Sequence, residues 1–455
     1  MAGVSAAREA AFKILLAVER GKVHADELLR GPAVNALEQA DRNLATTLVL
    51  GVLRWQIRLD QQFKQHLTKP GAKLDAEVLI ALRMGAFQLL HLDRIPAHAA
   101  IGESVELAKQ AGHRFAAGMV NAVLRKLGIA CSGLLDDGTG WEAELAHPAW
   151  LLQRWKSFYG DETTREICRH GQLQPELAVR LADADAEGEL IGASAVLDPG
   201  RLLADARIVT SGDVATTEAF RSGRVRIQDE GSQLIAEIAA DSRPGTELVQ
   251  RVKSIFDACA APGGKTMILA ERNPEAKIVA CESSPQRMTA MKERVAGFGE
   301  RIECRLVDAA TLNETEKYDV ALVDVPCSGT GTLGRNPEIR HRLHMDDLAR
   351  HAERQRAILC AAIRAVRPGG RIVYSTCSLE PEENEQVVDA VLAELGGLRR
   401  IPLIERIDAK RGAGILTAEG AAALRACITA EGALRLIPGA LGTDGFFVVL
   451  IEKTD

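Results

Sequence analysis

The feature that most constrains the fold is a change of pattern near Ile255, after which short apolar runs alternate with helical stretches up to the C-terminus. The runs are SIFDACA, KIVACE, CRLVDA, YDVALVDVP, RIVYSTCS, LRLIP and GFFVVLIEK. Continuous apolar strands separated by helices are typical of a mostly parallel sheet that is covered on both faces. In such sheets ligands bind beyond the carboxyl ends of the strands. The polar residues at those ends are therefore the candidates for function.

The chain before this change has a different pattern. From Ala6 to about Leu127 apolar residues recur at helical spacing, which predicts a helical bundle with breaks at Gly31-Pro32, Lys69-Pro70-Gly71 and Ile95-Pro96. Helices are expected over 148–158 and 161–170, followed by short mixed pieces. The expected fold is multidomain, with an all-α bundle (1–130), a linker (131–146), a small α+β insert (147–230) and an α/β domain of Rossmann type (231–455).

Composition narrows the class of protein. No run of about 18 residues is both apolar and free of charge, so neither a membrane span nor a signal peptide is expected, and the expected location is cytoplasmic. The nine cysteines are scattered and include no C-x-x-C pair, which argues against disulfides and against a metal site. The formal net charge is −6, but residues 1–130 hold 17 Lys and Arg against 12 Asp and Glu. This balance is compatible with a nucleic-acid partner for the helical part, and also with an ordinary solvated surface.

The stretch DACAAPGGKT, residues 257–266, ends the first strand of the second pattern and enters a helix. Its small residues let a ligand approach the backbone, and N–H groups at a helix start point outward. It matches neither the dinucleotide fingerprint nor the phosphate loop. Later strand ends carry the carboxylates Glu282, Asp308 and Asp324, of which the first two can accept hydrogen bonds from ribose hydroxyls and an adenine amino group. Together they predict an adenosine-containing ligand.

Two cysteines follow strand ends: Cys327 in DVPCSGTG, which leaves the strand that ends at Asp324, and Cys377 in YSTCS, which leaves the next strand. Neighbouring strands would place both thiols over the same cleft. A free cysteine is most often a buried, inert hydrophobe. A thiolate can also add to C6 of a pyrimidine and so activate C5 as a nucleophile, after which a second group must assist release. From the residues alone, either thiol could attack.

These residues carry a resemblance to a known family. The chain resembles the Sun/Fmu group of RNA 5-methylcytosine methyltransferases in DACAAPGGKT (257–266), DVPCSGTG (324–331), YSTCSLEPEENE (374–385) and LIPGALGTDGFF (436–447). The front part resembles the NusB-type helical RNA-binding domain in GVLRW (51–55), LRMGAFQLL (82–90), RIPAHAAIGE (94–103) and VNAVLR (120–125). The resemblance implies a NusB-like bundle and a class I methyltransferase domain that uses S-adenosylmethionine.

The resemblance also implies a role for each site residue. Cys377 would add to C6 of cytosine, Cys327 would help to release the product, and Asp324 would contact the N3/N4 edge of the base near the methyl donor. Glu282 would hold the ribose of S-adenosylmethionine and Asp308 its adenine. The loop that would cradle this cofactor consists of Cys259, Ala260, Ala261, Pro262, Gly263, Gly264 and Lys265.

The implied partner is RNA, and the expected substrate is a loop cytosine of 16S rRNA rather than DNA or a membrane. The sequence carries no signal of oligomeric state, and a monomer is the working expectation. A strip of nine arginines between Gly334 and Arg371 is a candidate for phosphate contacts, with ordinary surface charge as the alternative. Two other functions stay open: the same chemistry on tRNA or large-subunit rRNA, and a non-catalytic RNA-binding assembly or antitermination factor.

Overall fold

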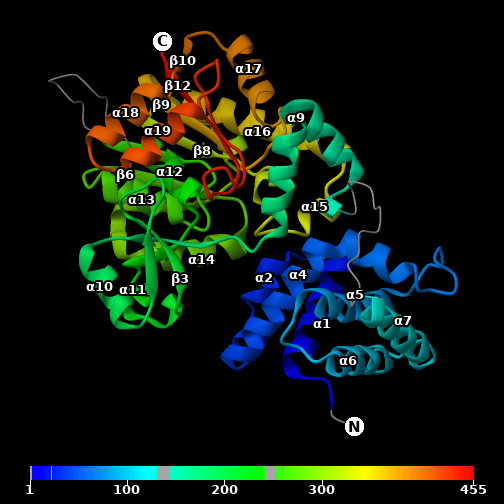
Figure 1. Ribbon diagram of the computed structural model, residues 1–455. Helices are drawn as coiled ribbons and strands as arrows, with labels where there is room; N and C mark the ends of the chain where they lie inside the picture. Colours follow the sequence, from blue (N-terminus) through cyan, green and yellow to red (C-terminus); the bar gives the residue numbers. More distant parts are fainter. Residues whose placement is uncertain (1–2, 22, 131–143, 241–251, 455) are drawn as a thin grey trace. The chain divides into compact units, whose positions relative to one another are not determined.

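The computed structural model describes residues 3–21, 23–130, 144–240 and 252–454 (Figure 1). Most of the linker predicted at 131–146 lies outside these residues. The chain forms two compact units. The first consists of Met1–Gln174 and Leu333–Leu343, and the second of Pro175–Thr332 and His344–Asp455.

The first unit is all helical, as predicted. Its elements are α1 (Ala6–Glu19), α2 (Ala25–Leu29), α3 (Pro32–Asn35), α4 (Gln39–Lys64), α5 (Ala76–His91), α6 (Ala97–Gln110), η1 (Arg114–Ala116), α7 (Ala117–Ala130), α9 (Ala149–Gln172) and α15 (Ile339–Arg342). Its apolar core includes Leu15, Leu48, Phe63 and Leu82. Helices are interrupted at the three predicted proline sites, because proline lacks the N–H that continues a helix.

The first compact unit extends to Gln174, beyond the boundary predicted after residue 146. Helix α9 belongs to the helical unit, not to the following sheet, and its two predicted halves meet at Gly160, where φ is +79°. The segment 333–343 returns to this unit through Arg340. Its buried guanidinium donates to the carbonyls of Gly171 at 2.8 Å and Ala146 at 3.2 Å. Burial lowers the pKa of Arg340 to about 9.

The second unit begins with a small antiparallel sheet, which gives the expected α+β character. Its strands have the order β2-β3-β1-β4. The elements are β1 (Leu177–Leu181), α10 (Ala184–Gly192), β2 (Val196–Pro199), β3 (Ala206–Ser211), η2 (Val214–Thr216), α11 (Glu218–Arg221) and β4 (Val225–Ile227). A small separate core, including Val179, Leu190 and Val225, lies on one side of this sheet.

The large sheet has eight strands in the order β10-β12-β9-β8-β5-β6-β7, with β11 paired to β12. Its first part comprises α12 (Glu230–Ala239), β5 (Ser254–Asp257), α13 (Gly264–Arg272), β6 (Lys277–Glu282), α14 (Pro285–Val295), η3 (Ala296–Arg301), β7 (Ile302–Leu306), η4 (Ala309–Thr311), β8 (Tyr318–Asp324) and η5 (Thr330–Thr332). It continues with α16 (Met345–Ala365), β9 (Val366–Thr376), α17 (Glu385–Glu394), β10 (Leu398–Ile401), α18 (Ile404–Gly412), α19 (Ala418–Ala426), β11 (Leu434–Leu436) and β12 (Phe446–Lys453). Strands β5 to β9 are parallel, and β10 to β12 pair antiparallel.

Successive residues of the central strands face opposite sides of this sheet. In β8, Val320 and Leu322 join the core shared with α12, α13 and α14, whereas Ala321 and Val323 join the core shared with α16 and α17. Both faces are thus covered, as the continuous apolar runs predict. Among the described residues, no helix combines the length and apolar character that crossing a bilayer requires.

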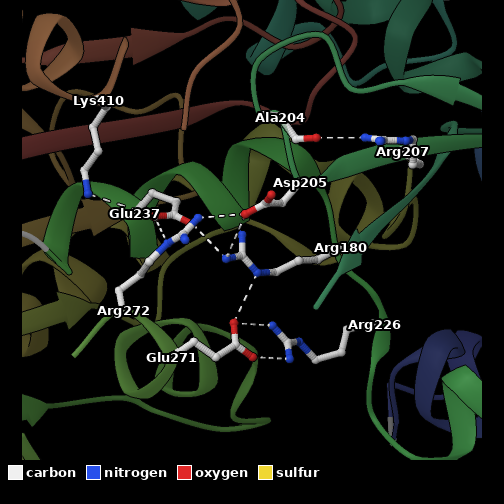
Figure 2. A network of polar contacts seen from close by, with 9 residues as sticks. All are labelled: Arg180, Ala204, Asp205, Arg207, Arg226, Glu237, Glu271, Arg272 and Lys410. Atoms are coloured by element: carbon white, nitrogen blue, oxygen red, sulfur yellow. Dashed lines mark hydrogen bonds and ion pairs between the residues drawn. The ribbon is translucent and has the colours of Figure 1, made fainter. Parts of the chain in front are cut away.

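A largely buried ion-pair network joins the small sheet to helices α12 and α13 (Figure 2). Arg180 of β1 contacts Glu237 of α12 at 2.9 Å and Glu271 of α13 at 3.3 Å. Arg272 also contacts Glu237, at 2.9 Å, and Arg226 of β4 contacts Glu271 at 2.9 Å. Burial acts to raise the pKa of Glu237, but hydrogen bonds from Arg272 and the nearby positive charges hold it below its usual value. The network therefore holds the small sheet against helices α12 and α13.

Replacing Glu237 by glutamine is expected to lower the free energy of unfolding by about 3 to 5 kcal/mol, because it leaves buried cations without their counter-charge. Chemical denaturation at pH 7 measures the change. The matched control is Glu271→Gln in the same network, where the side chain is 25% exposed and a loss of about 1 kcal/mol is expected. An equal decrease in the free energy of unfolding for the two variants would contradict the larger contribution assigned to Glu237.

Candidate functional site

The two cysteines lie at the carboxyl ends of adjacent strands. β8 and β9 are parallel neighbours, with Asp324 opposite Ser375. Cys327 and Cys377 follow in the loops beyond, and their Sγ atoms are 3.3 Å apart. The predicted adjacency of the thiols is confirmed, and both are partly exposed.

The surroundings of the two thiols are not equivalent. The hydrogen bond with Cys377, together with burial and the negative charge of Glu383, raises the pKa of Cys327 well above its usual value. Cys327 therefore keeps its proton in the free protein. In the contact between the two sulfur atoms either thiol can donate its S–H to the other.

Asp324 lies next to these thiols and holds a cation. One carboxylate oxygen contacts Nζ of Lys265 at 2.7 Å, and the other accepts a hydrogen bond from Ser375 Oγ at 2.7 Å. Burial acts to lower the pKa of Lys265, but the ion pair with Asp324 outweighs burial and raises it. Lys265, predicted only as part of the cofactor loop, thus lies at the same strand ends as the thiols.

The loop after β5 has the form expected of a ligand-binding turn. Gly263 has φ +101° and precedes α13, whose first N–H groups have no side-chain cap. A Cβ added at Gly263 would lie 3.2 Å from side-chain atoms of Met291 and Val295. The uncapped helix start fits a carboxylate such as that of S-adenosylmethionine.

Asp257 is a buried carboxyl at the start of this loop, and sequence reasoning did not single it out. One oxygen accepts a hydrogen bond from Thr266 Oγ1 at 2.7 Å, whereas Oδ1 is buried and has no hydrogen-bond partner among the described residues. Burial raises its pKa from 3.8 to about 7. An unpartnered buried carboxylate oxygen fits the ammonium group of an amino-acid ligand, which S-adenosylmethionine carries.

The raised pKa of Asp257 predicts a pH-dependent stability. The folded state holds this proton more tightly than the unfolded chain, so its contribution is present below about pH 4 and is lost as the pH rises through about 7. Asp257→Asn removes the titration while keeping an acceptor for Thr266. Its stability relative to the wild type should rise by about 2 to 3 kcal/mol between pH 5 and pH 8. Thermal unfolding of the ligand-free proteins tests this, and a constant difference would count against it.

The other two predicted carboxylates follow β6 and β7. Glu282 is almost fully buried, accepts a hydrogen bond from the Ser284 N–H at 2.8 Å, and contacts Arg287 at 3.2 Å. Asp308 accepts from the Ala310 N–H at 3.1 Å and pairs with Arg354 at 3.0 Å. Both lie on the same edge of the sheet as the loop after β5, as predicted, and their contacts with a cofactor stay a prediction.

The predicted arginine strip is wrong for two of its members. Arg340 is buried against carbonyl groups, and Arg342 donates to the carbonyls of Val18 at 2.9 Å and Val23 at 2.6 Å. Further members form ion pairs within the protein: Arg350 with Asp347, Arg354 with Asp308, Arg356 with Glu394 and Arg367 with Asp319. An arginine-rich sequence does not distinguish phosphate-binding groups from those used in folding.

The chain matches known proteins over almost its whole length. Residues 248–452 match the family described as 16S rRNA methyltransferase RsmB/F, and residues 5–128 match the NusB family. The probable ribosomal RNA small subunit methyltransferase B of Bacillus subtilis (strain 168) is 33% identical, covering 98% of each chain. The ribosomal RNA small subunit methyltransferase B of Pseudomonas putida is 36% identical, covering 91% of this chain and 95% of that protein. The crystal structure of PH0851 covers 98% of each chain, with a TM-score of 0.77 and 25% sequence identity.

A NusB-type helical domain followed by a Rossmann-like domain defines an S-adenosylmethionine-dependent methyltransferase, and the predicted fold class and cofactor are confirmed. The two ribosomal RNA small subunit methyltransferases B match this chain over more than nine tenths of its length at 33% and 36% identity, which identifies the family within this class. The chain belongs to the ribosomal RNA small subunit methyltransferase B family.

Proposed function

We propose that the protein methylates C5 of a cytosine in 16S rRNA, in the cytoplasm. The names of its relatives supply the RNA target. The observation that carries the chemistry is the pair of thiols, 3.3 Å apart, at the ends of adjacent strands. Carbon methylation of cytosine requires covalent activation of the ring, because C5 alone is a poor nucleophile.

In this proposal Cys377 is the nucleophile. Its thiolate forms a bond to C6, and the electron pair displaced from the C5–C6 double bond makes C5 nucleophilic. When bound, S-adenosylmethionine supplies an electrophilic methyl group. Cys327 first gives up its own proton to water, and its thiolate then takes the proton from C5, the S–C6 bond breaks, and Cys377 leaves as a thiolate. The hydrogen bond with Cys377 is the largest cause of the raised pKa of Cys327, and a thioether at Cys377 removes both that hydrogen bond and the charge on its sulfur, so the Cys327 proton becomes easier to lose at this stage.

Asp324 and Lys265 orient the base in this proposal. The ion pair and the Ser375 hydroxyl keep the Asp324 carboxylate in one place, where it can accept a hydrogen bond from the cytosine N4 amino group. Lys265 keeps a positive charge beside the strand ends, where it is paired with Asp324. The loop Cys259–Lys265 with Asp257, Glu282 and Asp308 would hold the cofactor.

The target cytosine has to leave its stack before C6 is accessible. Turning the base out of its stack costs a few kcal/mol, and this cost is lowest for a base in a loop. A loop cytosine is therefore the substrate that this site fits best.

The test is bisulfite sequencing of total RNA from a strain that lacks the gene, and from the same strain complemented with the wild type. Loss of one methylcytosine in 16S rRNA, restored by complementation, is the expected result. Loss of a methylcytosine in tRNA or large-subunit rRNA instead would show that this RNA, and not 16S rRNA, is the substrate. Calorimetric titration with S-adenosylmethionine adds a second measurement, since a protein that acts only by binding RNA would show no heat.

A further inference from the structure

Glu383 is a buried carboxylate whose partners lie on both cysteine-bearing loops. Its side chain has no exposed surface. It accepts hydrogen bonds from the Ser328 N–H at 2.8 Å, from Ser378 Oγ at 2.5 Å, and from the Ser328 hydroxyl. Ser328 follows Cys327 directly and Ser378 follows Cys377 directly. One carboxylate therefore joins the residues next to the two thiols.

The serine pair repeats the geometry of the thiol pair. The two serine Oγ atoms are 3.0 Å apart, and the two cysteine Sγ atoms are 3.3 Å apart. Backbone contacts extend the match, since the Gly331 N–H donates to the Cys377 carbonyl at 2.9 Å. The loops thus run side by side, and contacts one residue away set the spacing of the sulfur atoms.

Helix α16 supplies a third anchor. The Gln355 side-chain amide donates to Glu383 at 2.9 Å and to the Pro326 carbonyl at 3.0 Å, directly before Cys327. Within the described part of the chain, the partners of this carboxylate are a backbone N–H, an amide and two hydroxyls, all uncharged. A buried carboxylate needs its acceptor sites filled. Any shift of either loop leaves a buried charge with fewer donors, so Glu383 resists such a shift.

We propose that Glu383 is a positioning residue that fixes the distance between Cys327 and Cys377. The reaction that this distance serves rests on the proposed function, but the distance itself does not. Displacement of a reacting group by about 1 Å can slow an enzyme roughly 100-fold.

The first test measures the spacing without any RNA. Phenylarsine oxide binds two close thiols, forming two As–S bonds and releasing one water. Wild-type protein should bind one equivalent, and Cys327→Ala none. Glu383→Ala should react at least ten-fold more slowly. Glu383→Gln should recover most of the rate, because its amide can donate hydrogen bonds to the serine hydroxyls, which then accept instead of donating. The control Glu382→Ala, at the adjacent position, should react at the wild-type rate. A folded Glu383→Ala protein that binds the arsenical like the wild type overturns the proposal.

If Glu383→Ala does not fold, the double variant Ser328→Ala/Ser378→Ala replaces it. This variant keeps the carboxylate but removes the hydroxyl bridge, and it should show the same slow dithiol capture. Capture at the wild-type rate overturns the proposal.

The second test uses turnover. Glu383→Ala should lower kcat about 100-fold with the KM for S-adenosylmethionine within two-fold of the wild type, and Glu383→Gln should rescue most of the loss. Wild-type turnover in Glu383→Ala overturns the proposal. If the wild type methylates no cytosine but dithiol capture still depends on Glu383, the proposed function fails and the positioning role stands.

Discussion

Replacing Cys377 by alanine is expected to lower cytosine methylation by about 10⁴-fold or more, because it removes the thiol that adds to C6 in the proposed function. Affinity for S-adenosylmethionine should stay within two-fold of the wild type, since the loop that we propose to hold the cofactor follows β5 and not β9. Transfer of a labelled methyl group to 16S rRNA, with calorimetry of the cofactor, measures both quantities.

The matched control for this variant is Cys427→Ala, which removes a partly exposed thiol just beyond α19. It should methylate like the wild type. Turnover in Cys377→Ala at more than a tenth of the wild-type rate would exclude a covalent role for Cys377.

The parts of the fold that the sequence predicts are those governed by local patterns. Strands β5, β6, β8 and β9 coincide with apolar runs, because a strand buried on both faces has to be apolar throughout. The edge strand β7 includes Glu303 and Arg305, and the predicted run CRLVDA overlaps it only in part. The return of segment 333–343 to the helical unit could not be predicted. It depends on Arg340, whose partners are carbonyl groups about 170 and 190 residues earlier in the chain, and whose type is usually exposed.

The site shows the same division. The thiols and the acidic strand ends follow from position alone, because residues that end adjacent parallel strands lie on one edge of the sheet. The roles of Asp257, Lys265 and Glu383 depend on burial and on partners from other elements. The stretch YSTCSLEPEENE contains Glu383 among four glutamates, and nothing in the sequence distinguishes the one that joins the two loops. The glutamates that follow the small polar residues of YSTCS are the signal that could have directed attention to this stretch, although not to Glu383 in particular.

The second large effect concerns Cys327. Cys327→Ala should leave addition to C6 and methyl transfer intact but remove the base that takes the C5 proton, so the RNA stays bonded to Cys377. Denaturing electrophoresis should show a protein–RNA adduct that carries labelled methyl and accumulates to about one per protein, while turnover falls at least 100-fold. The double variant Cys327→Ala/Cys377→Ala should form no adduct.

The two single variants also decide which thiol attacks, a question that the order of the residues leaves open. An adduct that accumulates in Cys377→Ala and is absent in Cys327→Ala would exchange the two roles.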